Sequence, residues 1–364
     1  MLIGGEHLQS IWYEADSDTV FIIDQTRLPR HFEIIGLNSL DAAAHAISSM
    51  QVRGAPLIGV TAAYGIYLAM GEDPRQLDTA ITRLQATRPT AVNLRWALAR
   101  CEELLSPLAP GQRRERALEL AQVMEKEDIA ICEAIGEHGA KLLQSHWQQH
   151  CQPGERLNIL THCNAGALAT VDWGTALACV YKAAAAGVPL HVWVDETRPR
   201  NQGAALTCWE LGQQDIPHTL IVDNAGGHLM QRGRVDLCIV GSDRTTLGGD
   251  VCNKIGTYLK ALAARDNEIP FYVALPVSSI DFELHSGRDI PIEERCAEEV
   301  TEFTAEDDSG ERRTLQLAPQ GVAVSNPGFD VTPAALVSGL ITERGVVAAN
   351  AEALSRLRDS LQEG

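Results

Sequence analysis

One of the nine cysteines in this chain of 364 residues lies in a sequence suited to chemistry. Cys163 follows the apolar run Leu157–Leu160 and lies in the small, polar stretch Thr161–Gly166, after which an alanine-rich helical pattern begins near Gly174. A strand, a turn and a helix in this order are typical of α/β ligand sites, where reactive side chains gather at the carboxyl ends of parallel strands. The amides of the turn could also lower the pKa of the thiol. We therefore expect Cys163 to carry chemistry.

Further polar clusters follow later apolar runs. They are Asp195–Gly203, Asp223–His228, Gly241–Asp250 and the pair Ser325-Asn326. Connecting loops of two to six residues do not require so many acidic, amide and arginine side chains. One shared active site is therefore favoured over four loops that are merely rich in caps and turns.

Within these clusters, Asp243 is the strand-end carboxylate that could work with the Cys163 thiol, although an ion pair with Arg244 or an Asx turn is the alternative. The glycines at Gly248-Gly249, followed by Asn253 and Lys254 at the expected start of a helix, fit a phosphate group. The sequence lacks the G-x-x-x-x-G-K-[ST] pattern of a nucleoside triphosphate loop and the G-x-G-x-x-G pattern of a dinucleotide site. A small polyol phosphate is therefore the expected ligand.

An arginine in the first half of the chain is a second candidate for anion binding. Arg53 lies in the breaker Gln51–Pro56, and Pro56 opens a new apolar helix. A loop next to a helix N-terminus suits an anion. A surface arginine bonded to a local carbonyl is the alternative.

The elements that must position these residues follow from the hydrophobic pattern. In residues 1–150 we predict strands Thr19–Ile23 and His31–Ile35, a helix capped by Ser39, and helices near Pro56–Met70, Asn93–Leu105 and Arg113–Ala140. In residues 151–364 we predict strands Leu157–His162, Leu190–Val194, His218–Val222, Asp236–Val240, Pro270–Leu275 and Gly321–Ser325. Helices at 174–186, Ala204–Gln213, Gly227–Arg232 and Asn253–Arg265 alternate with these strands, and Glu294–Pro319 is expected to be a charged, irregular surface excursion. The fold class is therefore α/β, with a C-terminal doubly wound, Rossmann-like parallel sheet and a smaller N-terminal domain of short antiparallel strands and helices.

The composition excludes several kinds of partner. A formal net charge of −18 argues against a nucleic-acid surface. No apolar run approaches the roughly 20 residues that a membrane span needs, and the N-terminus lacks a secretory signal pattern. The cysteines have no spacing typical of a structural metal site. We expect a cytoplasmic protein with no metal, membrane or nucleic-acid partner.

Six blocks, spread over nearly the whole chain, resemble the methylthioribose-1-phosphate isomerase family. These blocks are Val52–Pro56, Arg88–Leu94, Thr161–Gly166, Glu196–Ala204, Gly241–Tyr258 and Asn326–Pro333. The resemblance implies a homodimeric aldose–ketose isomerase of methionine salvage that uses no cofactor and is related in fold to the α, β and δ subunits of the eukaryotic initiation factor 2B complex. Its substrate would be 5-methylthioribose 1-phosphate and its product 5-methylthioribulose 1-phosphate.

The resemblance also assigns roles to individual residues. The catalytic cysteine of the family falls on Cys163, and its proton-donating aspartate falls on Asp243. The substrate-binding residues of the family fall on Arg53, Gly54, Ala55, Arg88, Gln202, Asn253 and Lys254.

Three departures from the family pattern lie beside these residues. Ala165 replaces the usual threonine, Ser242 the usual alanine, and Gly328 another alanine. Because the catalytic residue types are intact, these changes bear on the 5-substituent of the sugar more than on the reaction. The alternatives are 5-deoxyribose 1-phosphate and, less favoured, ribose 1,5-bisphosphate. A non-enzymatic regulator like the initiation-factor relatives is least favoured, because both Cys163 and Asp243 are present.

Overall fold

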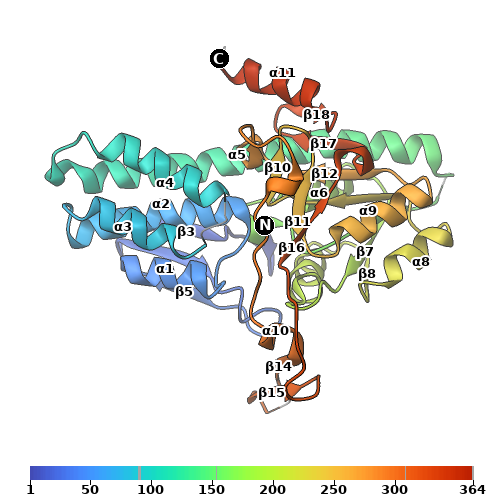
Figure 1. Cartoon of the computed structure of the whole chain (residues 1–364), viewed down its shortest axis with the longest axis horizontal. Helices are drawn as coiled ribbons and strands as arrows, with labels where there is room; N and C mark the ends of the chain where they lie inside the picture. The colour runs from blue at the N-terminus through green and yellow to red at the C-terminus, as the bar shows by residue number, and fades with distance from the viewer. Residues whose placement is uncertain (89–91, 153, 308, 363–364) are drawn as a thin grey trace.

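The computed structural model describes residues 1–88, 92–152, 154–307 and 309–362. A helical N-terminal half and a C-terminal half built on a large sheet lie side by side (Figure 1). Of the family block that begins at Arg88, residues 89–91 lie outside the described residues. None of the described helices has the length and apolar character needed to cross a membrane.

The N-terminal segment of the chain forms two small antiparallel sheets. One is a hairpin, and the other has the order β3-β4-β5. Their strands are β1 (Leu2–Ile3), β2 (Glu6–His7), β3 (Ile11–Glu14), β4 (Thr19–Ile23) and β5 (Ile34–Leu37). The predicted strand Thr19–Ile23 is confirmed, whereas the strand predicted at His31–Ile35 begins three residues later.

In the described part of this half, five helices follow the sheets. They are α1 (Leu40–Ser48), α2 (Ala55–Glu72), α3 (Leu77–Gln85), α4 (Val92–Leu105) and α5 (Pro110–His150). Ser39 caps α1 as predicted, since its side chain accepts a hydrogen bond from the amide of Ala42. Helix α2 is buried around almost its whole circumference, so it forms the centre of the N-terminal core. The sequence prediction missed α3.

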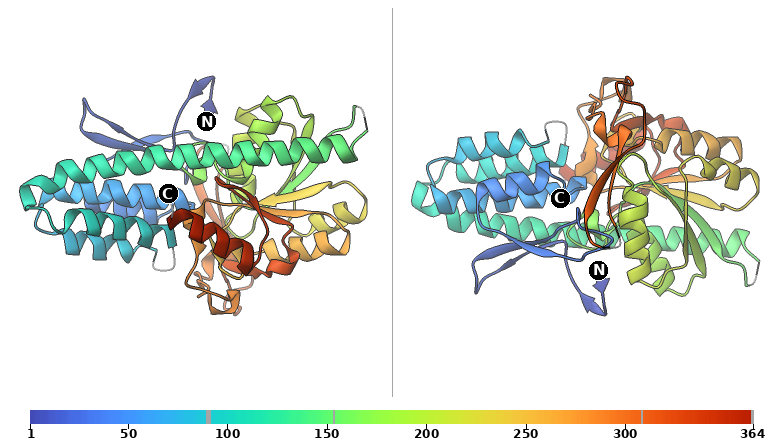
Figure 2. Two further views of the ribbon diagram at one scale, coloured as in Figure 1. Left: turned by 90° about the horizontal axis from the view of Figure 1, so that it is seen from above. Right: turned by 90° about the horizontal axis from the view of Figure 1, so that it is seen from below.

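Helix α5 spans both halves of the molecule (Figure 2). Its residues Ala121 and Met124 pack in the N-terminal core, whereas Ile135 and Leu143 pack against the large sheet. Close contact with α6 (Ala176–Ala185) needs a small residue at Gly139, because a Cβ there would lie 2.1 Å from the Sγ atom of Cys179. One helix therefore joins the two cores.

The large sheet confirms the predicted parallel α/β architecture. Its strand order is β18-β17-β12-β9-β6-β7-β8, and all neighbours are parallel except the β17–β18 pair. The strands are β6 (Leu157–Thr161), β7 (Leu190–Asp195), β8 (His218–Ile221), β9 (Leu237–Val240), β12 (Phe271–Ala274), β17 (Gly339–Thr342) and β18 (Gly345–Val347). Alternate side chains of β6 belong to different cores, Ile159 on the face with α5 and α6 and Leu160 on the face with α9.

The helices that connect these strands lie close to their predicted positions, except that α9 starts later than predicted. Besides α6 they are α7 (Cys208–Gln213), which follows a π-helical turn at Gly203–Thr207, α8 (Ala225–Gln231) and α9 (Thr257–Asp266). Helix α11 (Ala351–Gln362) closes the chain. Single 3₁₀ turns occur at Ala167–Ala169, Val277–Ser279, Gly287–Asp289 and Ala334–Leu336.

A second sheet, with the order β13-β10-β11-β16, corrects two predictions. Its strands are β10 (Arg244–Thr246), β11 (Val251–Lys254), β13 (Ile280–Asp281) and β16 (Phe329–Thr332). The helix predicted to start at Asn253 is wrong there, because Asn253 and Lys254 pair with β16 and α9 begins only at Thr257. The strand predicted at Gly321–Ser325 is also wrong, since the strand of this region is β16.

The segment predicted to be irregular contains regular structure. Helix α10 (Glu298–Thr301) precedes a hairpin of β14 (Glu302–Glu306) and β15 (Arg312–Gln316), which projects from the molecule in Figure 1. All five residues of β15 are exposed, so no apolar alternation identified this strand.

Candidate active site

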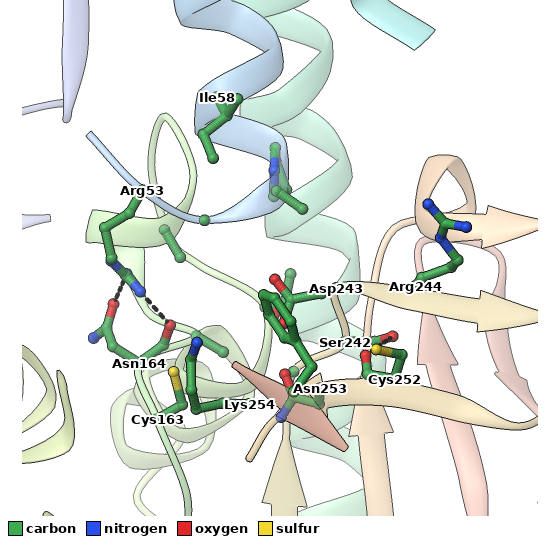
Figure 3. A pocket seen from close by; sticks show the side chains of 18 of the residues that line it. Arg53, Ile58, Cys163, Asn164, Ser242, Asp243, Arg244, Cys252, Asn253 and Lys254 are labelled. Atoms are coloured by element: carbon green, nitrogen blue, oxygen red, sulfur yellow. Dashed lines mark hydrogen bonds between the residues drawn. The ribbon is translucent and has the colours of Figure 1, made fainter. Parts of the chain in front are cut away.

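One pocket between the two halves is lined by all nine residues to which the family resemblance assigned a role. They are Arg53, Gly54, Ala55, Arg88, Cys163, Gln202, Asp243, Asn253 and Lys254. The N-terminal half contributes the turn before α2, and the C-terminal half contributes the ends of β6, β9 and β11 (Figure 3). Segments far apart in the sequence thus meet at the carboxyl edge of the parallel sheet.

Arg53 is buried and tightly held. Its Nη1 donates to the carbonyl of Asn164 at 2.8 Å, its Nε donates to Oε1 of Gln25 at 3.1 Å, and its Nη2 donates to Oδ1 of Asn164. The turn needs a glycine at Gly54, where φ is +97° and a Cβ would lie 2.3 Å from the carbonyl oxygen of Ala169. The structure confirms that Arg53 lies next to the start of α2, as predicted. Because its side chain is buried, the alternative of a surface arginine is wrong.

The backbone of Cys163 adopts a left-handed conformation, with φ at +67°. Its amide donates to Oγ1 of Thr197 at 2.8 Å, and its carbonyl accepts from Oγ1 of Thr207 at 2.7 Å. The thiol donates to Oε1 of Gln202 at 3.2 Å. Two hydroxyl groups thus hold a strained residue so that its sulfur faces the pocket.

Burial raises the pKa of the Cys163 thiol, and the charges of Lys254 and Arg53 only partly oppose this effect. The amide of Asn164 lowers the pKa as expected from the turn, but it is a minor influence. The expectation of a lowered pKa is therefore wrong. Burial therefore favours the protonated thiol over the thiolate.

Asp243 follows β9, and its amide donates to the carbonyl of Cys252 at 3.0 Å. Burial raises the pKa of its carboxyl group, while Lys254, Arg88 and Arg53 lower it. The side chain of Arg244 points away from Asp243 in Figure 3, and its Nη1 lies 3.6 Å from Oδ2 of Asp281. The raised pKa suits a carboxylic acid that donates a proton.

Two more cations face the same space. The Nζ atom of Lys254 donates to the carbonyl of Gly328 at 3.1 Å and lies 4.3 Å above the ring of Phe329. The Nη2 atom of Arg88 lies 3.7 Å from Oε2 of Glu293. Burial lowers the pKa of both cations. Together with Arg53 they give the pocket enough positive charge for a phosphate dianion.

Some predicted residues lie elsewhere. The expected phosphate loop at Gly248-Gly249 does not line the pocket, because these residues form the turn between β10 and β11. The carboxylate of Asp250 instead accepts from the amides of Gly287 and Ala334, at 2.8 and 2.9 Å. Ser325-Asn326 is not part of the pocket lining either.

The sequence analysis missed Glu210, which is buried in α7. Its carboxylate accepts from Nδ2 of Asn164, the amides of Ala167 and Leu168, and the hydroxyl of Tyr181, at 2.7–3.2 Å. Glu210 therefore orients the Asn164 side chain that holds Arg53. The only signal in the sequence was a carboxylate within an otherwise apolar helical pattern.

One group of side chains in the described part of the chain has the spacing of a metal site. Ligand atoms of His162, Asp195 and Asp223 lie within 4.8 Å of one another. However, the ammonium of Lys260 lies 3.1 Å from Oδ2 of Asp195 and donates to the carbonyl of Asp223. A protein cation thus already compensates the charge of Asp195.

Comparisons with known proteins agree with this arrangement. Residues 51–349 match the model of the initiation factor 2 subunit family. A methylthioribose-1-phosphate isomerase of Methylocella silvestris is 59% identical over 358 residues, which cover 98% of each chain. The solved structure of 5-methylthioribose 1-phosphate isomerase from Pyrococcus horikoshii is 38% identical with a TM-score of 0.83, covering 98% of this chain and 97% of that chain. Subunit delta of the translation initiation factor eIF-2B from A. fulgidus is 41% identical with a TM-score of 0.79, covering 96% of this chain and 100% of that chain.

Proposed function

The chain belongs to the methylthioribose-1-phosphate isomerases of the initiation factor 2 subunit family, and we propose that it converts 5-methylthioribose 1-phosphate to 5-methylthioribulose 1-phosphate. The observation that carries this proposal is the pocket in which a half-buried thiol and a half-buried carboxyl group face three cations. Neither a binding module nor a regulator needs such a pair of reactive groups.

The cations and the turn before α2 would hold the phosphate group. Arg53, Arg88 and Lys254 supply charge, and Gly54 lets the backbone come close. Firm binding of the phosphate matters chemically, because elimination of phosphate is the obvious side reaction of the opened sugar.

Asp243 would open the ring. The anomeric carbon carries the phosphate ester, so the ring cannot open as a free aldose does. A protonated Asp243 gives its proton to the ring oxygen as the bond from that oxygen to C1 breaks. The resulting carboxylate then accepts the proton of the C2 hydroxyl as the C2 carbonyl forms, which restores the acid.

Hydrogen must also move from C2 to C1, and two routes are open. In one route, the Cys163 thiolate takes the C2 proton and returns it to C1 through an enediolate-like intermediate. In the other route, a hydride shifts directly and Cys163 shapes the charge around C1 and C2. The raised pKa of the thiol favours the second route, because a thiol that keeps its proton is no base.

Isotope transfer tests the route. With substrate deuterated at C2, a direct hydride shift leaves deuterium at C1 of every product molecule in ordinary water. Proton transfer through Cys163 washes part of the label into solvent, and such a loss would contradict the hydride route.

The lining of the pocket supports an apolar 5-substituent. Ile58, Pro276, Ile290 and Pro291 form an apolar part of the wall, which suits a methylthio group or the methyl group of 5-deoxyribose 1-phosphate. A second phosphate, as in ribose 1,5-bisphosphate, would lose hydration against such a wall.

Values of kcat/KM for the three sugar phosphates test the function and rank the substrates. We expect kcat/KM to be highest for 5-methylthioribose 1-phosphate, lower for 5-deoxyribose 1-phosphate and lowest for ribose 1,5-bisphosphate. Turnover by Cys163→Ser and by Asp243→Asn should fall by about 100-fold or more while the variants stay folded. Near-normal turnover of either variant, or a preference for the bisphosphate, would contradict this proposal.

We also propose a cytoplasmic homodimer. All nine cysteines are free thiols, which fits a reducing compartment. Large apolar side chains are exposed on β8, in the loop after it and on α9, namely Leu220, Val222, Leu259 and Leu262. Light scattering should give twice the mass of the chain, and a monomer at micromolar concentration would exclude the dimer.

A further inference from the structure

The imidazole of His162, the residue before Cys163, is almost completely buried between two acceptors. Its Nδ1 lies 2.8 Å from Oδ2 of Asp195, and its Nε2 lies 2.8 Å from the carbonyl oxygen of Ile255. A carbonyl oxygen can only accept, so Nε2 must carry a proton. Lys260 also donates toward Oδ2 of Asp195, at 3.1 Å, so the same carboxylate oxygen contacts both the imidazole and the ammonium group.

Three carboxylates and the ammonium of Lys260 surround the ring. Asp195 of β7 and Asp223, which follows β8, face the ring from one side, with Oδ1 of Asp223 3.9 Å from Nδ1. Lys260 belongs to α9, and Asp330 of β16 accepts from the amide of Gly256 at 2.7 Å. Oδ1 of Asp195 is buried and has no hydrogen-bond partner among the described residues. The contacts of this carboxylate in the described residues are therefore those that its Oδ2 makes with His162 and Lys260.

The ring also connects two parts of the active site. Ile255 follows Asn253 and Lys254, and its own amide donates to the carbonyl of Gly328 at 3.2 Å. Gly256 packs on the ring, because a Cβ at this position would lie 2.9 Å from Cε1 of His162. The turn that ends β11 is thus built around the His162 ring, whose own backbone continues into the left-handed Cys163.

We propose that His162 is a positioning residue of the isomerase, whose two ring contacts fix the strand end bearing Lys254 relative to the Cys163 turn. The proposal rests on the function proposed above. The contact with Ile255 places Lys254 against the phosphate, and the contact with Asp195 anchors the backbone that precedes Cys163.

Two amide variants separate these contacts. The side-chain nitrogen of His162→Gln lies close to the position of Nε2 and keeps the Ile255 contact, whereas that of His162→Asn lies close to Nδ1 and keeps the Asp195 contact. We expect KM for the sugar phosphate to rise about tenfold or more in His162→Asn and to stay near the normal value in His162→Gln, with kcat lowered in both variants. The matched control is the exposed His228 of α8, whose replacement by Gln or Asn should leave both constants unchanged.

A spectroscopic measurement tests the Ile255 contact without relying on activity. In protein labelled with ¹⁵N-histidine, the Nε2 atom of His162, assigned by its absence from the variants, should show an attached proton, because it donates to the Ile255 carbonyl. An Nε2 atom without a proton would overturn the proposal, as would equal KM values for the two variants. If the unmodified protein has no isomerase activity, the proposed function fails, while the spectrum still decides the state of His162.

Discussion

Asp128 offers a test of the burial energetics in the middle of α5. Its carboxylate is buried, accepts from the amide of Val171 at 2.7 Å and has the thiol of Cys132 4.0 Å away. Burial raises its pKa from 3.8 to about 7. The corresponding stability is therefore fully present below the unfolded pKa and is lost as pH rises to the folded pKa.

The magnitude follows from linkage. A pKa raised from 3.8 to about 7 corresponds to about 4 kcal/mol of lost stability at alkaline pH. Between pH 5 and pH 8 the loss grows by about 3 kcal/mol. Asp128→Asn removes this titration, keeps an oxygen for the Val171 amide and adds an NH₂ group whose burial costs about 1–3 kcal/mol at every pH.

The assay is urea unfolding of both proteins from pH 5 to pH 8. The free energy of unfolding of Asp128→Asn, measured relative to the natural chain, should increase by about 3 kcal/mol from pH 5 to pH 8. This increase does not depend on which protein is more stable at pH 5. The control is Glu127→Gln, which breaks a partly exposed ion pair 2.7 Å long with Arg100 and should cost less than about 1 kcal/mol. A difference between Asp128→Asn and the natural chain that does not change with pH would refute the reasoning.

Three other results are expected. Burial raises the pKa of Asp243, so its acid form persists to higher pH than that of an exposed aspartate. Turnover should therefore fall as the pH rises through this raised pKa. A plot of turnover against pH for Asp243→Asn should lack this fall. Because burial raises the pKa of Cys163, its alkylation by iodoacetamide should be slow at pH 7 and should accelerate above pH 9. Mass spectrometry follows the reaction at this residue. Fast alkylation at pH 7 would contradict the raised pKa. Gly54→Ala should lower the free energy of unfolding by about 2–4 kcal/mol. The residue has a φ of +97°, and the added Cβ would lie 2.3 Å from the carbonyl oxygen of Ala169. An unchanged unfolding midpoint would show that this turn can adjust.

Local patterns in the sequence predicted the parts of the fold that local physics determines. The buried strands of the large sheet read as short apolar runs, and the cap at Ser39 marked the start of α1. Strands β11 and β16 were not predicted, because they form by pairing with each other, and this pairing joins Cys252 to Val331 across a long stretch of chain. No local signal distinguishes such a strand from the start of the next helix.

The site shows the same division. The residue types and the turn sequence pointed to Cys163 and Asp243, since reactive groups at strand ends follow a known rule. The direction of the thiol pKa depended instead on how deeply the pocket buries it, which only the packed structure determines. Glu210 was missed for a related reason, because its four donors come from two other segments of the chain, the turn after β6 and helix α6.

Helix α5 limits how this protein can be divided or redesigned. The predicted boundary near residue 150 lies at the end of this helix, yet its Met124 belongs to one core and its Leu143 to the other. A polypeptide cut at that boundary would leave half of a helix without its sheet and the sheet without the helix that covers α6. We expect neither fragment to fold alone. Exchange of parts between relatives should therefore keep α5 with both of its packing partners.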